Sequence, residues 1–244
     1  QAVENMREKL EDRAYVEHYV NTLTHELKGP LTAIQASAEL LKEDLPLNDQ
    51  QQFAQHIHAQ SQRLKLLIDR MLLLTRLEKS KHQIELQNFN LSKLIQQVLD
   101  QQASQLQSKK IQCLLDIEAN CMIHADRFWL QQTIANILDN ALDFSAESSK
   151  ILIQLHRQAH QSIQLQIFNE GEWIPEYALS QVFDTYFSLP RPITQQRSSG
   201  IGLSIVKQVI EQHHGQIQIQ NIQENNIAII QPHQQGVLVS IVLP

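Results

Sequence analysis

The first group in this chain that could do chemistry is His25, which is followed directly by the acid Glu26. Apolar residues recur at heptad-like spacing over residues 16–27, which predicts the buried seam of a helical bundle or coiled coil. His25 lies two positions past Leu23, about 200° around the helix, so its imidazole should face solvent or a second domain. Pro30 cannot donate an N–H to the carbonyl of Glu26, and the helix should bend there.

Two further patterns, in the second half of the chain, suit a metal ion and a phosphate. The run NILDNA at residues 136–141 places Asn136 and Asn140 on one helix face. A neutral carboxamide oxygen is a suitable ligand for Mg²⁺. The run SSGIGL at residues 198–203 contains two glycines, which let backbone N–H groups approach a phosphate closely before a helix N-terminus. Taken alone, this glycine run is equally typical of a simple helix start.

The order and spacing of these motifs and two others resemble the sensor histidine kinases of two-component systems, over nearly the whole chain. The motifs are HELKGPL at residues 25–31, NILDNA at 136–141, NEGEWIP at 169–175, VFDTYF at 182–187 and the glycine run. Within this family, the run SLPR at residues 188–191 is similar to the CreC-type sensors.

The resemblance implies an ATP-dependent protein-histidine kinase. His25 would accept a phosphoryl group from ATP, and Glu26 would hydrogen-bond or accept the proton released. Asn140 would bind Mg²⁺, and Asn136 would support the phosphates. The phosphoryl group would then pass to an aspartate in the receiver domain of a response regulator. The other ATP-binding residues that the resemblance implies are Asn169, Gly171, Ile174, Phe187, Arg191, Ser199, Gly200, Gly202 and Leu203.

Two departures from the family pattern concern the adenine base. Asn169 replaces an aspartate that normally accepts a hydrogen bond from the adenine amino group. Without a formal charge on the acceptor, this bond should be weaker. Trp173 replaces a glycine, and it either packs at the edge of the base or is a plain exposed aromatic residue.

Other departures concern the phosphates. Thr185 stands where the family usually has a basic residue, which puts one phosphate contact in doubt, and Asp143 occupies a position that is often basic near the phosphates. Arg191 or Arg197 could supply that contact instead. Ser198 replaces the first glycine of the last motif.

Gly29 stands four residues after His25, where many family members carry a Thr or Asn that orients a water for dephosphorylation of the regulator. Positions i and i+4 share a helix face, so the missing side chain predicts weak phosphatase activity. Gly29 would also ease the bend before Pro30. Two other functions stay open: a catalytically dead dimeric scaffold, which the departures favour, and an ATP-driven conformational clamp without phosphotransfer.

The first part of the chain should position the histidine on a helical hairpin. Residues 3–45 predict one long helix, residues 46–49 a turn, and residues 50–79 a second helix with its own apolar seam. Two helices with one seam each cannot bury both seams alone. We therefore expect a homodimer whose two hairpins form a four-helix bundle, with a monomeric hairpin packed on the next domain as the alternative.

The second part should form the nucleotide site. Residues 81–89 predict a linker between a dimerisation and phosphoacceptor domain (1–80) and a catalytic domain (90–244). Helices are expected over residues 91–107, 126–144 and 200–214, with Asp126 capping the second, and strands over 111–117, 121–124, 151–155, 163–168, 216–220 and 236–243. Strands grouped with helices on one face predict an α+β sandwich, and the resemblance implies that it is of the GHKL ATPase type.

Composition narrows the class of protein. The chain has 244 residues, enough for two ordinary domains, and 42% hydrophobic residues support a core. A net charge of −6 argues against a nucleic-acid partner. No apolar run is long enough to span a membrane. Because the chain begins within a helical pattern, we expect a cytoplasmic fragment. The resemblance implies missing upstream sensor and transmembrane segments, which would hold the full-length protein in the bacterial inner membrane.

The two cysteines and the histidines predict no further site. Cys113 and Cys121 lie in apolar surroundings, and they are either a disulfide across adjacent strands or two buried thiols in a reducing cytosol. The histidines show no metal-ligand spacing, and His213-His214 before Gly215 is typical of a helix end.

Overall fold

The computed structural model describes residues 24, 26–79, 84–158, 162–192, 198–223 and 235–244. His25 and Arg197 lie outside these described residues. The chain divides into two compact units, Gln1–Leu73 and Leu74–Pro244, and each is considered by itself.

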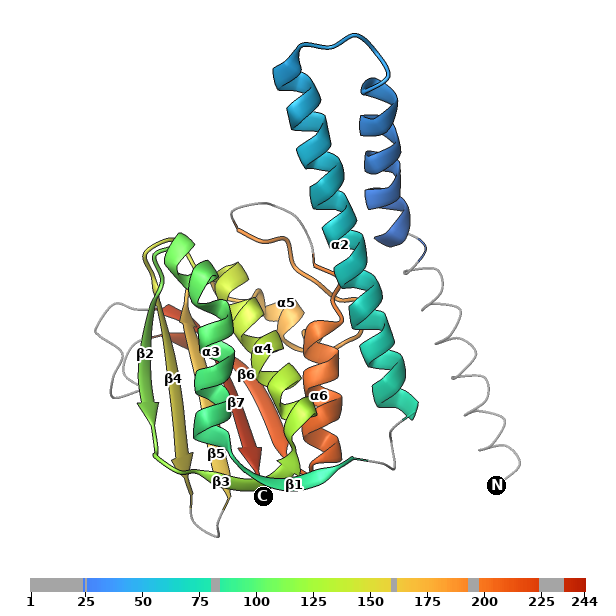
Figure 1. The fold of residues 1–244 in the computed structure, drawn as a ribbon. Helices are drawn as coiled ribbons and strands as arrows, with labels where there is room; N and C mark the ends of the chain where they lie inside the picture. Colours follow the sequence, from blue (N-terminus) through green and yellow to red (C-terminus); the bar gives the residue numbers. More distant parts are fainter. Residues whose placement is uncertain (1–23, 25, 80–83, 159–161, 193–197, 224–234) are drawn as a thin grey trace. The chain divides into compact units, whose positions relative to one another are not determined.

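The first unit contains a helical hairpin (Figure 1). Its first helix is described over residues 26–40 and continues through Pro30, and the bend predicted there stays a prediction. The helix ends at residue 40 rather than at the predicted residue 45, and residues 41–43 form a turn and a bend. The second helix, α2, spans Leu47–Lys79 and crosses into the second unit. Ser37 Oγ lies 3.1 Å from His56 Nδ1, which ties the two helices together.

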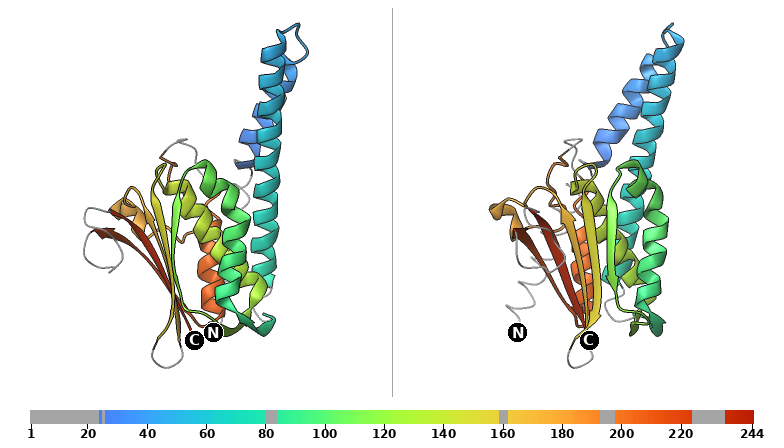
Figure 2. Two further views of the ribbon diagram at one scale, coloured as in Figure 1. Left: turned by 60° about the vertical axis from the view of Figure 1, so that its left-hand side comes forward. Right: turned by 90° about the vertical axis from the view of Figure 1, so that its left-hand side faces the viewer.

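The second unit is built on a five-stranded mixed sheet in the order β2-β4-β5-β7-β6, with β2 and β4 parallel and the other pairs antiparallel. Helices α3, α4 and α6 cover one face of this sheet (Figures 1 and 2). Strands β1 and β3 form a separate antiparallel pair. The elements are β1 Leu86–Asn90, α3 Leu91–Ser108, β2 Gln112–Ile117, β3 Met122–Asp126, α4 Arg127–Phe144, β4 Lys150–Arg157, β5 Ile163–Glu170, α5 Glu176–Leu179, α6 Gly202–Gln212, β6 Gln216–Gln223 and β7 Gln235–Leu243.

This arrangement confirms the predicted α+β sandwich and most of its elements. The prediction differs at residues 81–89, because Leu86–Asn90 forms β1 rather than part of a linker. This strand pairs with β3, more than 30 residues later in the chain, and local sequence carries little signal for such a pairing. The boundary between the units also lies earlier than residue 80. Leu74 and Leu77 are fully buried, and Gln212 Nε2 donates to the carbonyl of Leu77 at 3.5 Å.

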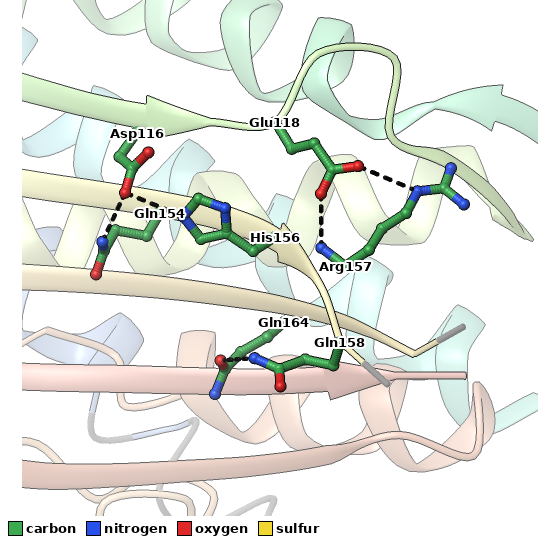
Figure 3. Close-up of polar contacts among 7 residues, drawn as sticks. All are labelled: Asp116, Glu118, Gln154, His156, Arg157, Gln158 and Gln164. Atoms are coloured by element: carbon green, nitrogen blue, oxygen red, sulfur yellow. Dashed lines mark hydrogen bonds and ion pairs between the residues drawn. The ribbon is translucent and has the colours of Figure 1, made fainter. Parts of the chain in front are cut away.

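Alternation along β4 separates the two faces of the sheet. Ile151, Ile153 and Leu155 are fully buried, whereas Gln154 and His156 point to the opposite face. There a row of polar side chains joins neighbouring strands (Figure 3). Asp116 Oδ2 accepts hydrogen bonds from Gln154 Nε2 at 2.9 Å and from His156 Nε2 at 3.0 Å. We call these three residues the open-face cluster.

The cysteines are free thiols, so no disulfide joins them. Cys113 lies on β2 of the large sheet, and Cys121 lies just before β3 of the small one. Burial raises the pKa of both thiols, which favours the protonated form. The expectation of two free thiols is therefore confirmed and that of a disulfide is wrong. Cys121 is fully buried, whereas Cys113 is only partly buried.

Candidate functional site

Helix α4 carries the asparagine pair and is fixed at both ends. Asp126 is its N-cap, as predicted, and its Oδ1 accepts from the Trp129 N–H at 3.1 Å. The spacing of four puts Asn136 and Asn140 on one face, with Asn136 buried and Asn140 partly exposed. The Asn136 Nδ2 is buried, and no hydrogen-bond partner for it is found among the described residues. An unpaired buried amide is unfavourable unless a ligand satisfies it.

Gly202 brings the start of α6 against this asparagine face. A Cβ at Gly202 would lie 3.6 Å from Asn136 Oδ1, so its backbone packs directly on the carboxamide. The N-cap of α6 is Ile201, which gives no side-chain hydrogen bond to the first turn. Ile201 therefore supplies no side-chain cap to the first backbone N–H groups of α6, and helix N-termini of this kind can bind anions.

Gly200 joins the glycine run to the aromatic motif. Its φ is +64°, and a Cβ there would come within 2.4 Å of the Tyr186 carbonyl carbon and 2.5 Å of the Phe187 oxygen. The Gly200 carbonyl accepts from the Tyr186 N–H at 3.0 Å. Only glycine fits this close approach, so Phe187 is held beside the loop that contains Ser199 and precedes Leu203.

Gly171 connects the third motif to the end of α4. A Cβ at Gly171 would lie 2.5 Å from the Phe144 carbonyl oxygen, and Ser145 and Gly171 form a β-bridge. Asn169, at the end of β5, is only 7% exposed, and its Nδ2 is another buried amide without a partner in the described part of the chain. The three glycines thus bring all four motifs of the second unit together around α4.

A further residue of this region, Asn221 on β6, was missed by the sequence analysis. Its Oδ1 accepts from the Ile174 N–H at 2.9 Å, and its Nδ2 donates to the Ile174 carbonyl at 2.8 Å. These two hydrogen bonds fix the position of the segment after Gly171. Trp173 is 43% exposed, and its indole N–H donates to the Ile222 carbonyl at 3.4 Å. Nothing in the local sequence of β6, a row of polar and apolar residues, distinguishes Asn221.

One departure from the family pattern, Asp143, lies against Arg191, a residue that could supply a phosphate contact. Arg191 Nε and Nη2 lie 2.7 and 2.6 Å from the same oxygen, Asp143 Oδ2. Asp143 is in the last turn of α4, and Arg191 follows the aromatic motif. The two residues are 48 positions apart, so the local sequence gives no indication of this contact.

The structure describes the predicted phosphoacceptor segment only in part. His25 lies outside the described residues, while Glu26 is a half-buried residue of the first helix. The described side chains contain no group of three His, Cys, Asp or Glu residues that could hold a metal ion. Of the helices that are described, none is both long and apolar enough to cross a membrane.

Comparisons with known proteins place the chain in a family. Residues 16–80 match the family described as His Kinase A (phospho-acceptor) domain. Residues 125–244 match the histidine kinase-, DNA gyrase B-, and HSP90-like ATPase. The chain is 38% identical over 229 residues to the sensor protein CreC of Escherichia coli (strain K12), covering 93% of this chain and 47% of that protein. It is 30% identical over 200 residues to the sensor protein DltS of Streptococcus agalactiae serotype III (strain NEM316), covering 82% and 49%.

The chain therefore spans about half the length of these curated relatives. Among solved structures, the histidine kinase ThkA in complex with the response regulator protein TrrA has a TM-score of 0.75 at 23% identity. The match covers 99% of this chain and 65% of that chain, and it concerns the fold. With a phospho-acceptor helical domain followed by an ATPase domain, the chain belongs to the sensor histidine kinases.

Proposed function

We propose that this chain is the kinase portion of a two-component sensor, which phosphorylates itself on His25 with ATP. The observation that carries the proposal is the convergence of four motifs around α4, with two buried carboxamides that lack partners among the described residues. We assign dimerisation and phosphoacceptor functions to residues 1–80 and ATP binding to residues 90–244, with β1 at the start of the ATP-binding part.

The proposed ATP site follows α4. Asn169 would face the adenine base, with Gly171 and Ile174 shaping that end. Asn136 and Asn140 would lie along the polyphosphate, whose negative charge the uncapped N-terminus of α6 favours. Contacts from the neighbouring loops would come from Phe187, Arg191, Ser199, Gly200, Gly202 and Leu203.

The carboxamide oxygens of this face fit Mg²⁺, which prefers oxygen ligands and keeps several waters. We propose Asn140 as its protein ligand, because it lies on the same face as the buried Asn136 but is partly exposed. When bound, Mg²⁺ would neutralise charge on the polyphosphate.

In the proposed reaction a neutral His25 nitrogen attacks the γ-phosphorus of ATP. An N–P bond forms, the bond from phosphorus to the β,γ-bridging oxygen breaks, and ADP leaves with that electron pair. Glu26 hydrogen-bonds the imidazole or accepts its proton. The phosphoryl group then passes to an aspartate of a response regulator, while Gly29 leaves phosphatase activity weak.

The proposed partners are a second copy of the chain and a response regulator. The apolar seams of the hairpin would be buried in a dimeric four-helix bundle. We further propose that upstream segments anchor the full-length sensor in the bacterial inner membrane, with this portion in the cytoplasm.

The decisive experiment is incubation with γ-labelled ATP and mapping of the labelled residue. We expect acid-labile, base-stable label that His25→Gln abolishes, with ATP binding and dimerisation unchanged. His58→Gln, at an exposed histidine of α2, is the matched control and should label normally. Undiminished label in His25→Gln would end the proposal, and ATP binding without any label in the wild type would favour a dead scaffold.

A further inference from the structure

The ion pair between Asp143 and Arg191 extends the asparagine face of α4. Asp143 follows Asn140 by three residues and Asn136 by seven, so all three side chains leave the helix on one side. The guanidinium binds a single carboxylate oxygen through two of its nitrogens. A cation from the segment after the aromatic motif is thereby fixed beside the face that carries the asparagines.

The Arg191 side chain remains partly exposed within the pair. Arginine has five N–H donors, and these two contacts use two of them. The side chains of Arg191 and Asp143 are 27% and 30% exposed. Surface ion pairs contribute little to folding, so stability alone is a weak reason for this arrangement.

We propose that Asp143 is a positioning residue, which holds Arg191 so that its remaining donors bind the polyphosphate of ATP. The pair would replace the single basic side chain that the family often carries at position 143. This inference rests on the proposed function and deepens it. Orienting the planar guanidinium in advance lowers the entropy lost on binding, and the guanidinium offsets the repulsion between Asp143 and phosphate.

The proposal predicts a change of sign between two backgrounds. In the wild type, Asp143→Ala should weaken binding, because Arg191 loses its fixed orientation. In Arg191→Ala, an uncompensated carboxylate stays near the phosphates, so the added Asp143→Ala should strengthen binding. A pair that only ties two segments together would not produce this reversal.

The test measures the affinity of the 244-residue chain for a non-hydrolysable ATP analogue with Mg²⁺, by calorimetry. We expect Asp143→Ala to lower the affinity about tenfold and Arg191→Ala to lower it further. Losing a hydrogen bond to a charged group typically lowers affinity by about tenfold or more. The double variant should bind more tightly than Arg191→Ala. Asp143→Glu should retain most of the wild-type affinity.

Glu118→Ala and Arg157→Ala are the matched controls, because they break another Arg–carboxylate pair of the same unit (Figure 3). They should bind the analogue as the wild type does. Wild-type affinity in Asp143→Ala, at an unchanged melting temperature, would overturn the positioning role and leave the proposed function standing. The same loss from Asp143→Ala in both backgrounds would also overturn it. A wild-type chain that binds no nucleotide would overturn the proposed function itself.

Discussion

The carboxamides of Asn136 and Asn169 are buried and have no partner for their Nδ2 groups in the described part of the chain, whereas the partly exposed carboxamide of Gln154 has one. The first two residues belong to the candidate ATP site. Gln154 belongs to the open-face cluster, where it donates to Asp116 (Figure 3). The usual relation between burial and hydrogen bonding is therefore reversed between these two regions.

The reversal indicates what each region is built for. Leaving a buried amide unpaired costs about 1–3 kcal/mol, an expense that a ligand can offset on binding. Backbone crowding separates the glycines of the candidate site from the glycine of the hairpin. Gly200 and Gly171 meet neighbouring backbone within 2.5 Å of an added Cβ, whereas Gly29 on the hairpin meets nothing within 4 Å. The region around α4 thus contains features that lower local stability, as binding sites often do.

The sharpest test of this contrast removes a carboxamide from each region. Asn140→Ala should reduce Mg²⁺-dependent ATP binding and autophosphorylation to background, because the proposed metal ligand is lost. Its melting temperature should stay near the wild-type value, since Asn140 is partly exposed. Gln154→Ala is the control and should bind ATP normally. Calorimetric titration measures the ATP affinity of both variants, and thermal melting measures their stability. Wild-type affinity in Asn140→Ala would contradict the metal assignment.

A second test concerns the glycines. Gly200→Ala should destabilise the second unit by about 1–3 kcal/mol or displace the aromatic motif, because the positive φ and the contacts with Tyr186 and Phe187 exclude a Cβ. Gly29→Ala should instead stabilise the helix by about 0.5–1 kcal/mol. Denaturant unfolding measures both. Equal effects of the two substitutions would show that the crowding around Gly200 relaxes readily.

These contrasts also show how far the sequence could lead. Local signals worked: Asp126 before a helical pattern was correctly predicted as a cap, and the spacing of Asn136 and Asn140 correctly placed them on one face. Contacts between residues far apart in the sequence were not predicted. Asn221 binds Ile174 from 47 positions away, and Arg191 binds Asp143 from 48. A single sequence contains no local pattern for contacts that only the folded chain creates.

A third prediction addresses Asn169, whose buried amide stands where a carboxylate is usual in the family. Asn169→Asp should increase ATP-over-GTP selectivity by about tenfold, because a carboxylate accepts from the adenine amino group and cannot donate to guanine. The nucleotide-free protein should become less stable, since the substitution places a charge at a buried position. Competition titrations measure the selectivity. Asn88→Asp, at an exposed asparagine of β1, is the control, and identical selectivity in Asn169→Asp would refute the assignment.

A fourth prediction concerns the hairpin. Gly29→Thr should accelerate dephosphorylation of a purified phosphorylated response regulator a few-fold, because a hydroxyl on this helix face can orient a water. The open space around Gly29 lets the side chain fit. Gly29→Ala separates this effect from simple helix stabilisation. If both variants leave the decay rate unchanged, another group must position the water.

The smallest expected effect lies in the open-face cluster. Hydrogen bonds from Gln154 and then His156 lower the pKa of Asp116 below its ordinary value of 3.8. The folded protein therefore binds this proton less tightly than the unfolded chain does. The resulting stabilisation is complete above the unfolded pKa and is lost as the pH falls through the lower, folded one.

Asp116→Asn should flatten this part of the acid unfolding profile. The effect should be slight, because the Asp116 side chain is 40% exposed and solvent screens it. The free energy of unfolding measured by urea titration at several pH values below 5 provides the test, and ATP affinity at neutral pH should not change. A steep loss of ATP binding in Asp116→Asn would mean that the open face communicates with α4, and the division between a paired and an unpaired region would then fail.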